Sequence, residues 1–257
     1  MAIDSNDRAE RRFERAASII RTSKTVVAFT GAGISVASGI PDFRSPGGLW
    51  SKYDPFEVAS AHALDTNPRK VWEFMLETVD LLDRCGPNPA HQALAELETS
   101  NHLAGIITQN IDNLHQRAGS QRVVEYHGNF QRFYCHSCQR DCPEEEARTL
   151  SKQSIPVHCS ACGGLVRPDV VFFGEAIPAQ AQQQSMQLVQ AADAILIVGT
   201  SGEVAPANVL PRQVKLSGGQ VIEINLGQTS YADITDVRFD APVEEVLPKL
   251  ADMVLAQ

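Results

Sequence analysis

The sequence lacks any long hydrophobic run. None of its apolar stretches approaches the roughly 20 residues that a helix needs to cross a bilayer. The N-terminal stretch 1–18 is charged and polar, without the apolar core of a secretion signal. Phe13, Ala16, Ala17 and Ile20 have the spacing of an amphipathic helix. Internal repeats and low-complexity linkers are absent as well. We therefore expect a protein of the cytoplasm that does not associate with membranes.

An excess of basic residues is also missing. The 31 acidic side chains outnumber the 22 lysines and arginines, which gives a net charge of −9. This balance argues against nucleic acid or an anionic membrane as the main partner. The 257 residues, 43% of them hydrophobic, suit one large domain that carries a small satellite. We expect a monomer.

Short apolar stretches with the character of buried strands alternate with helical patterns along the chain. The expected strands are 24–30, 103–108, 194–200 and 220–227, and the expected helices include 67–85, 87–98, 179–191 and 243–256. This alternation indicates an α/β fold with a doubly wound parallel sheet. Three strands end at Thr30, Thr108 and Thr200, where polar or glycine-rich turns follow. Such sheets bind ligands at the carboxyl ends of their strands.

The first strand runs into the glycine-rich turn "GAGIS". Gly31 permits a tight turn, and Gly33 lets the backbone come close to a pyrophosphate. The third glycine of the dinucleotide fingerprint is replaced by Val36, and the acidic ribose-binding residue expected about 20 positions later is missing. The following stretch 38–50 is too rich in glycine and proline for a helix. These departures disfavour a dehydrogenase, and a turn without a ligand stays an alternative.

Four of the six cysteines form two Cys-x-x-Cys pairs, Cys135/Cys138 and Cys159/Cys162, which 20 residues separate. This is close to zinc-ribbon spacing, and four thiolates make a closed tetrahedral site with no position for water. Competing ligands near the pairs are His136, Cys142 and His158. The stretch 131–166 has few large aliphatic residues, so we expect an insertion that the metal holds together. A complete thiolate shell would leave His127, in "EYHGN", free for other chemistry.

Taken in order, the motifs "GAGISVASGIPDFRSPGGLW", "TQNIDNLHQRAG", "EYHGN", the cysteine pairs, "RPDVVFFGE", "VGTS" and "INLG" resemble the sirtuins, the NAD-dependent protein lysine deacylases. Among these, the chain looks like the compact bacterial deacetylase type. The resemblance implies a Rossmann-like NAD domain (1–48, 86–130 and 167–257), a helical module of the small domain (49–85) and a zinc-binding insertion (131–166). NAD and the acyl-lysine would meet in the cleft between them.

The resemblance also implies a set of cofactor-binding residues. Gly31, Ala32, Gly33 and Ser35 would hold the pyrophosphate and ribose, and Asp42, Phe43 and Arg44 would lie on a cofactor loop. Gln109, Asn110, Ile111 and Asp112 would line the ribose and nicotinamide pockets. Gly199, Thr200, Ser201, Asn225 and Leu226 would contact the adenosine half, and Val243 the adenine.

His127 matches the catalytic histidine of the family. An imidazole can draw a proton from a ribose hydroxyl near neutral pH, while Asn110 and Asp112 can orient the ribose and the nicotinamide. Each of the three also has a simpler explanation. His127 could be a core histidine bonded to a backbone carbonyl, and Asn110 and Asp112 could cap the helix that follows.

Two segments match those between which sirtuins take an extended peptide as an added strand. The expected substrate contacts are Val171, Phe173, Gly174, Glu175, Glu203 and Val204. Gly202 and Ala205 stand where sirtuins commonly have larger apolar residues, which leaves the flanking-residue preference open. The Tyr-x-x-Arg pair of desuccinylating sirtuins is absent, and Phe74 and Glu77 stand there.

The expected function is NAD-dependent deacetylation of protein lysine, with structural zinc. The alternatives are mono-ADP-ribosyl transfer, which shares the first step, and a zinc-ribbon interaction module with a vestigial NAD site.

Overall fold

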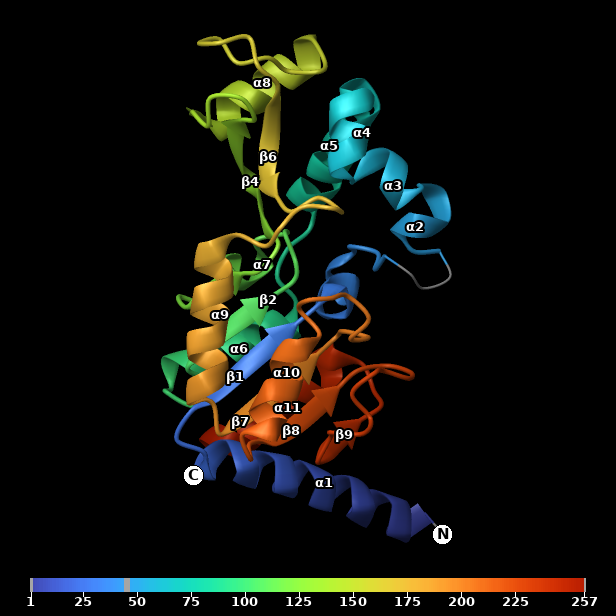
Figure 1. Cartoon of the computed structure of the whole chain (residues 1–257). Coiled ribbons are helices and arrows are strands. Elements are labelled where there is room, and N and C mark those ends of the chain that lie inside the picture. The colour runs from blue at the N-terminus through green and yellow to red at the C-terminus, as the bar shows by residue number, and fades with distance from the viewer. Residues whose placement is uncertain (1, 44–46, 257) are drawn as a thin grey trace.

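The computed structural model describes residues 2–43 and 47–256 (Figure 1). Arg44, one of the expected cofactor residues, lies outside the described residues. A parallel sheet is built from β1 (Val26–Thr30), β2 (Gly105–Thr108), β3 (Val123–Glu125), β7 (Ala194–Val198), β8 (Gln220–Ile224) and β9 (Val237–Phe239). Its order, β3-β2-β1-β7-β8-β9, confirms the doubly wound parallel sheet. The order reverses between β1 and β7, which is where such sheets leave a crevice for a ligand.

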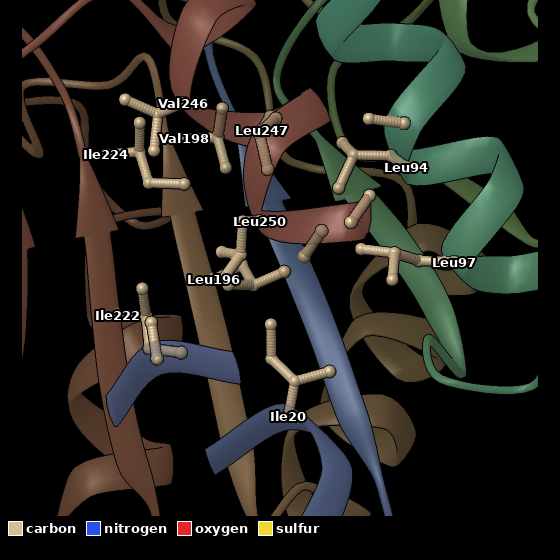
Figure 2. Close-up of a cluster of buried hydrophobic side chains, with 14 of the residues drawn as sticks. Ile20, Leu94, Leu97, Leu196, Val198, Ile222, Ile224, Val246, Leu247 and Leu250 are labelled. Carbon is tan, nitrogen blue, oxygen red and sulfur yellow. The ribbon is translucent and has the colours of Figure 1, made fainter. Parts of the chain in front are cut away.

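Helices cover both faces of this sheet. On one face lie α1 (Ala2–Thr22), α6 (Pro89–Thr99) and α11 (Val243–Leu255), and on the other α9 (Ala179–Ala191) and α10 (Val209–Leu216). Successive strand residues point to opposite faces, so Val26 and Ala28 join the first core and Val27 and Phe29 the second. Figure 2 shows leucines of α6 and α11 packed on the strands of the first core.

A second body lies beyond the carboxyl edge of the sheet (Figure 1). It contains α2 (Leu49–Lys52), α3 (Pro55–Val58), α4 (Ala61–Thr66), α5 (Pro68–Arg84), α8 (Glu144–Gln153) and the antiparallel strands β4 (Gly128–Cys135), β5 (Asp141–Cys142) and β6 (Val166–Val170). As expected, α5 begins with Pro68 in its first turn, and the Asn67 side chain accepts a hydrogen bond from the Lys70 amide.

The helical module and the cysteine-rich insertion share one hydrophobic core. Trp72 and Met75 of α5 pack with Phe133 of β4 and Val166 of β6, and the Trp72 indole donates to the Val166 oxygen at 3.1 Å. The domain boundaries stay a prediction; β4 and β6 each run across one of them. Within residues 2–43 and 47–256, none of the helices combines the length and apolar character that a membrane crossing requires.

Candidate active site

The carboxyl ends of β1, β2 and β7 bring three of the predicted segments together. The chain leaves β1 at Thr30 and forms a short 3-10 helix, η1 (Ala32–Ser38), which ends at Gly39 in the left-handed region with φ +91°. The long helix of a dehydrogenase is therefore replaced by this seven-residue 3-10 helix, and residues 40–43 after it have no regular secondary structure.

The two glycines of "GAGIS" are required by close packing against the end of β7. A Cβ added at Gly31 would lie 2.7 Å from the Thr200 Cβ, and one at Gly33 would lie 2.7 Å from the Gly199 Cα. Real side chains do not approach so closely. The Gly33 amide donates to the Gly199 oxygen at 2.8 Å, which ties the two turns together.

Ser35, Asn110 and Asp112 form a hydrogen-bonded group at this edge. The Ser35 hydroxyl donates to the Asp112 carboxylate at 2.7 Å, and the Asn110 amide nitrogen lies 3.1 Å from both the Ser35 Oγ and the Gly31 oxygen. Asp112 is buried, and this burial raises the pKa of its carboxyl. Its other oxygen accepts from the amide of Leu114, the first residue of α7 (Leu114–Arg117), at 2.9 Å. The N-cap position of α7 is Asn113, so Asp112 bonds to the start of this helix without being its N-cap, and it keeps the contact with Ser35.

His127 lies in the two-residue turn between β3 and β4, next to the same edge. Its Nδ1 is 3.0 Å from the Gln109 main-chain oxygen. A carbonyl oxygen only accepts, so Nδ1 carries the hydrogen and Nε2 is the acceptor of the neutral ring. Burial lowers the pKa of His127 below its usual value, and the bond to Gln109 opposes that shift. The ring is therefore available as a base near neutral pH.

Gly128 gives the turn the space that a side chain would fill. Its φ is +84°, and an added Cβ would lie 2.0 Å from the Asp169 oxygen. No other residue fits between the His127 turn and β6.

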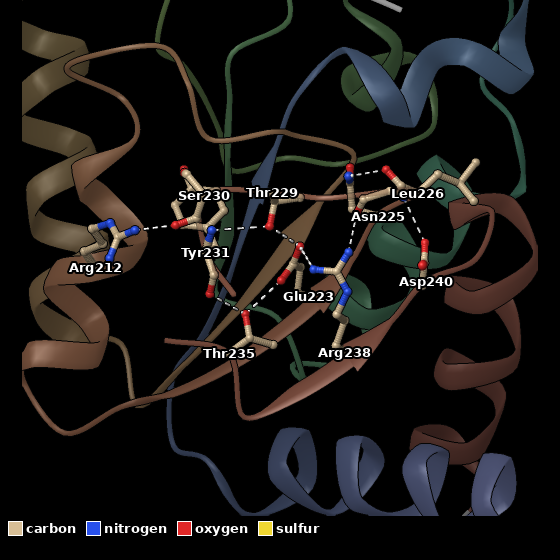
Figure 3. A network of polar contacts seen from close by, with 11 residues as sticks. Arg212, Glu223, Asn225, Leu226, Thr229, Ser230, Tyr231, Thr235, Arg238 and Asp240 are labelled. Atoms are coloured by element: carbon tan, nitrogen blue, oxygen red, sulfur yellow. Dashed lines mark hydrogen bonds and ion pairs between the residues drawn. The ribbon is translucent and has the colours of Figure 1, made fainter. Parts of the chain in front are cut away.

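Asn225 and Leu226, expected at the adenosine half, follow β8 (Figure 3). The Asn225 main-chain amide donates to the Phe239 main-chain oxygen at 3.1 Å, and Leu226 is 64% exposed. Below them, the fully buried carboxylate of Glu223 accepts from Thr229 (2.5 Å), Thr235 (2.8 Å) and Arg238 (3.0 Å). The Val243 side chain, by contrast, is packed in the first core, so any contact with adenine would come from its main chain.

Aromatic rings extend from the cofactor loop towards the expected peptide site. The Trp50 ring lies 5.0 Å from Phe43 and 6.2 Å from both Phe74 and Phe173. The Phe173 main chain bonds to Ala59 and Ala61, and the Val171 amide donates to the His127 oxygen at 2.9 Å. The segment 171–173 therefore contacts both this group of aromatic rings and the main chain of His127.

The remaining substrate residues have more varied surroundings. Glu175 accepts from both terminal nitrogens of Arg167 and from the Phe172 amide, so its carboxylate already holds its own loop together. Gly174, with φ +92°, has open space beside it. The Val204 main-chain oxygen accepts a hydrogen bond from the Asn208 amide, and the neighbouring Glu203 is exposed. The Ile111 main-chain oxygen accepts a hydrogen bond from the Phe130 amide.

The position of Gly202 has no room for a larger side chain. A Cβ there would lie 2.2 Å from the Ser230 Oγ and 2.5 Å from the Tyr231 ring. The Ser201 oxygen accepts from the Ser230 amide at 2.8 Å. The Tyr231 ring therefore occupies space that a larger residue at 202 would need.

The four paired cysteines converge on one point. Their sulfurs all lie within 4.8 Å of one another, with 3.5 Å between Cys135 and Cys162 and 3.9 Å between Cys138 and Cys159. Tetrahedral zinc with Zn–S bonds of about 2.3 Å sets neighbouring sulfurs about 3.8 Å apart, so the donor set fits the ion. The cluster does not include the competing ligands His136, Cys142 and His158.

Residues 31–206 match the model of the Sir2 family. The chain belongs to the Sir2 family. It is 44% identical over 241 residues to an NAD-dependent protein deacylase of Pyrococcus abyssi, covering 93% of this chain and 96% of that protein. An NAD-dependent protein deacetylase of Caldivirga maquilingensis is 45% identical, covering 94% and 91%.

Solved Sir2 structures agree in fold. A Sir2 homologue in complex with NAD superposes with a TM-score of 0.87 at 42% identity, covering 94% of this chain and 93% of that one. A Sir2 complex with a peptide and NAD has a TM-score of 0.85 at 35% identity, covering 91% and 95%. The resemblance to the sirtuins and the Rossmann-like sheet are thus confirmed, and the four clustered cysteines fit a zinc site.

Sequence reasoning missed a buried polar group beneath the Sir2 site. The His115 Nε2 lies 2.9 Å from the Thr30 hydroxyl, which donates to the Thr108 hydroxyl at 2.8 Å. Thr108 in turn accepts from the Asn110 amide at 3.1 Å. The His91 ring lies 4.9 Å from the His115 ring. A histidine among the alanines and leucines of "PAHQALAEL" was the available signal.

Proposed function

We propose that this Sir2 protein is an NAD-dependent protein lysine deacetylase. It transfers the acetyl group of acetyl-lysine to ADP-ribose and releases nicotinamide and O-acetyl-ADP-ribose. The observation that carries the proposal is the convergence of His127, its Nε2 left as an acceptor, with Ser35, Asn110 and Asp112 at the carboxyl edge of the sheet. The names of the relatives, deacylases and deacetylases, support it.

The roles of the site residues follow from this proposal. The main chain of Gly31–Gly33 and the Ser35 hydroxyl hold the pyrophosphate and ribose, and Asn110 and Asp112 orient the ribose and the nicotinamide. The acetyl oxygen attacks the ribose carbon as nicotinamide leaves. His127 then takes a proton from a ribose hydroxyl, which lets the 2′-oxygen attack the acetyl-derived carbon. Water releases the free lysine.

Zinc has a structural role in this proposal. Four thiolates complete its coordination shell, so no position is open for substrate or water. The ion would hold the two Cys-x-x-Cys pairs against β4 and β6, and the proton transfer would take place at His127.

The expected substrate is an acetylated protein or peptide bound as an added strand beside Val171–Gly174. Glu203, exposed in the facing loop, favours a basic residue next to the acetyl-lysine. Kinetics on matched peptides with Lys or Glu at that position would test this preference, and equal efficiency would refute it. A monomeric state, a cytoplasmic location and the absence of a nucleic-acid partner stay predictions.

Mass spectrometry of the products separates the proposal from its alternatives. Incubation with NAD and an acetyl-peptide should yield the deacetylated peptide, nicotinamide and O-acetyl-ADP-ribose in equal amounts. An ADP-ribosylated peptide would identify a mono-ADP-ribosyltransferase. No consumption of NAD would identify an interaction module.

A further inference from the structure

The turn that carries His127 is joined across its base by one side-chain contact. Glu125 is the last residue of β3, and Asn129 is the second residue of β4. The Asn129 amide nitrogen donates to the Glu125 Oε1. His127 lies midway between the two residues, so this bond closes the turn beneath the imidazole.

Glu125 also contacts α7 and a second residue of β4. Its Oε1 accepts from the Gln116 amide of α7 at 2.7 Å, and its Oε2 accepts from the Arg132 guanidinium of β4 at 2.7 Å. Arg132 then reaches Asp169 of β6 at 2.8 Å. Since the Glu125 side chain is only 16% exposed, solvent screens these contacts less than it would at the surface.

Asn129 extends the same group towards the segment that follows Asp112. Its amide nitrogen lies 3.1 Å from the Asn113 side-chain oxygen, and the Asn113 amide donates to Gln131 at 2.7 Å. Asn129 is buried. The group therefore joins α7, β3, β4 and β6 around one turn.

The main-chain bonds of the turn hold each side of it to a neighbouring strand. The Tyr126 amide donates to the Thr108 oxygen, and the His127 oxygen accepts from the Val171 amide. The next residue, Gly128, pairs with Val170 of β6. The contact across the base of the turn joins its β3 side to its β4 side and helps to keep Nδ1 on the Gln109 oxygen.

We infer that Glu125 is a positioning residue for His127, acting through Asn129 and Arg132 on the second half of the reaction. This inference rests on the proposed deacetylase function. In that reaction nicotinamide leaves before His127 is needed, so a displaced imidazole should slow acetyl transfer and spare the first step. A residue that merely stabilises the fold would affect both steps alike.

Two rates measured on the same enzyme test the inference. Exchange of labelled nicotinamide into NAD, in the presence of acetyl-peptide, reports the first step, and release of deacetylated peptide reports the whole reaction. In Glu125→Ala we expect the rate of deacetylation to fall by about 10- to 100-fold, because displacement of a reacting group by about 1 Å slows a reaction by this order. The rate of nicotinamide exchange should stay nearly unchanged. Glu125→Gln keeps the Oε1 acceptor and should recover part of the loss.

Glu98 offers a matched control at the opposite end of the same strand. Its carboxylate accepts from the amides of Gln121 and Arg122, at 3.0 and 2.7 Å, where the chain enters β3. Glu98→Ala should leave the ratio of the two rates at its wild-type value.

Equal losses of both rates in Glu125→Ala, or no loss, would overturn the positioning role. The exchange rate also shows whether each variant is folded. Failure of the proposed function looks different, because then the wild-type protein would show neither reaction.

Discussion

The imidazole of His127 is held to the main chain of Gln109 by a 3.0 Å hydrogen bond from Nδ1. The two residues belong to segments that follow neighbouring parallel strands, so the ring and the Gln109–Asp112 turn keep one fixed relationship. The bond leaves Nε2 as the acceptor, and it places the base outside the cysteine cluster.

Replacing His127 with alanine should abolish most deacetylation without releasing zinc. General base catalysis contributes about 10²- to 10⁴-fold, so the rate should fall by that order. Steady-state rates and zinc content by atomic emission check both parts. Loss of the metal from this variant would show that His127 belongs to the zinc site.

The acid limb of the pH profile of kcat/KM should have its midpoint below the usual pKa of histidine. Burial lowers the pKa of His127 from its usual 6.5, so the neutral, basic form persists at more acidic pH. This parameter reports groups of the free enzyme. A profile of kcat/KM between pH 5 and 8 should fall in acid with a midpoint below 6.5. A midpoint above 6.5 would contradict the assignment.

Stability should also decline in acid because of the buried histidines. Burial lowers the pKa of His91 to about 4, below the 6.5 of an exposed histidine. The unfolded chain therefore binds the proton first, so the contribution of His91 is complete above pH 6.5 and is lost as the pH falls towards 4. The difference between the two values corresponds to about 3 kcal/mol.

Urea unfolding of the wild type and of His91→Gln at several pH values measures this effect. The dependence on pH between 6.5 and 4 should be shallower in the variant. Parallel curves would show that His91 does not titrate on unfolding.

Removing one zinc ligand should release the ion, whereas removing a nearby cysteine should not. Cys138→Ser breaks the set of four thiolates, and we expect loss of zinc together with a lower thermal midpoint. Cys142 lies outside the cluster, with its sulfur 3.8 Å from the Pro143 oxygen. Cys142→Ser is therefore the matched control and should retain one zinc per chain. The reverse result would exchange the two roles.

Acetyl-lysine should be preferred to succinyl-lysine by at least about tenfold, because an unpaired buried carboxylate costs more than about 1.4 kcal/mol. Glu77 accepts from the Tyr53 hydroxyl and from Lys52, and the bond from Tyr53 lowers the pKa of Glu77, which keeps the carboxylate charged. Tyr53 in turn packs on Phe74, 5.1 Å between rings. Comparison of the two acyl-peptides tests this preference, and comparable rates would refute it. The double variant Phe74→Tyr, Glu77→Arg should narrow the gap.

Local patterns predicted the elements that local forces determine. Asn67 and Pro68 mark the start of α5 because capping depends on neighbouring residues. The short strands β3 and β9 escaped prediction, since three residues carry too little periodicity. The shared core of Trp72 and Val166 escaped too, because these residues lie 94 positions apart and meet only through packing.

The same distinction holds at the site. His127 and the cysteine pairs stand in recognisable motifs, so their grouping could be expected. The contact between the His91 and His115 rings depends on how α6 packs against α7, which no spacing in the sequence encodes. Glu125 was within the quoted motif "EYHGN", but its partners are one residue of α7 and two residues of β4, and only the folded chain shows them.

The pairing of Gly128 with Val170, between β4 and β6, has an evolutionary consequence. The chain runs to the cysteine cluster along β4 and returns along the antiparallel strand β6, so the two ends of this excursion lie side by side. Apart from the cysteines of the cluster and the residues packed in its core, the chain between Cys135 and Val166 can lengthen, shorten or change its sequence, provided that β4 and β6 keep their register. We expect variation among Sir2 relatives to accumulate in that segment, where new binding surfaces can arise without disturbing the turn at His127.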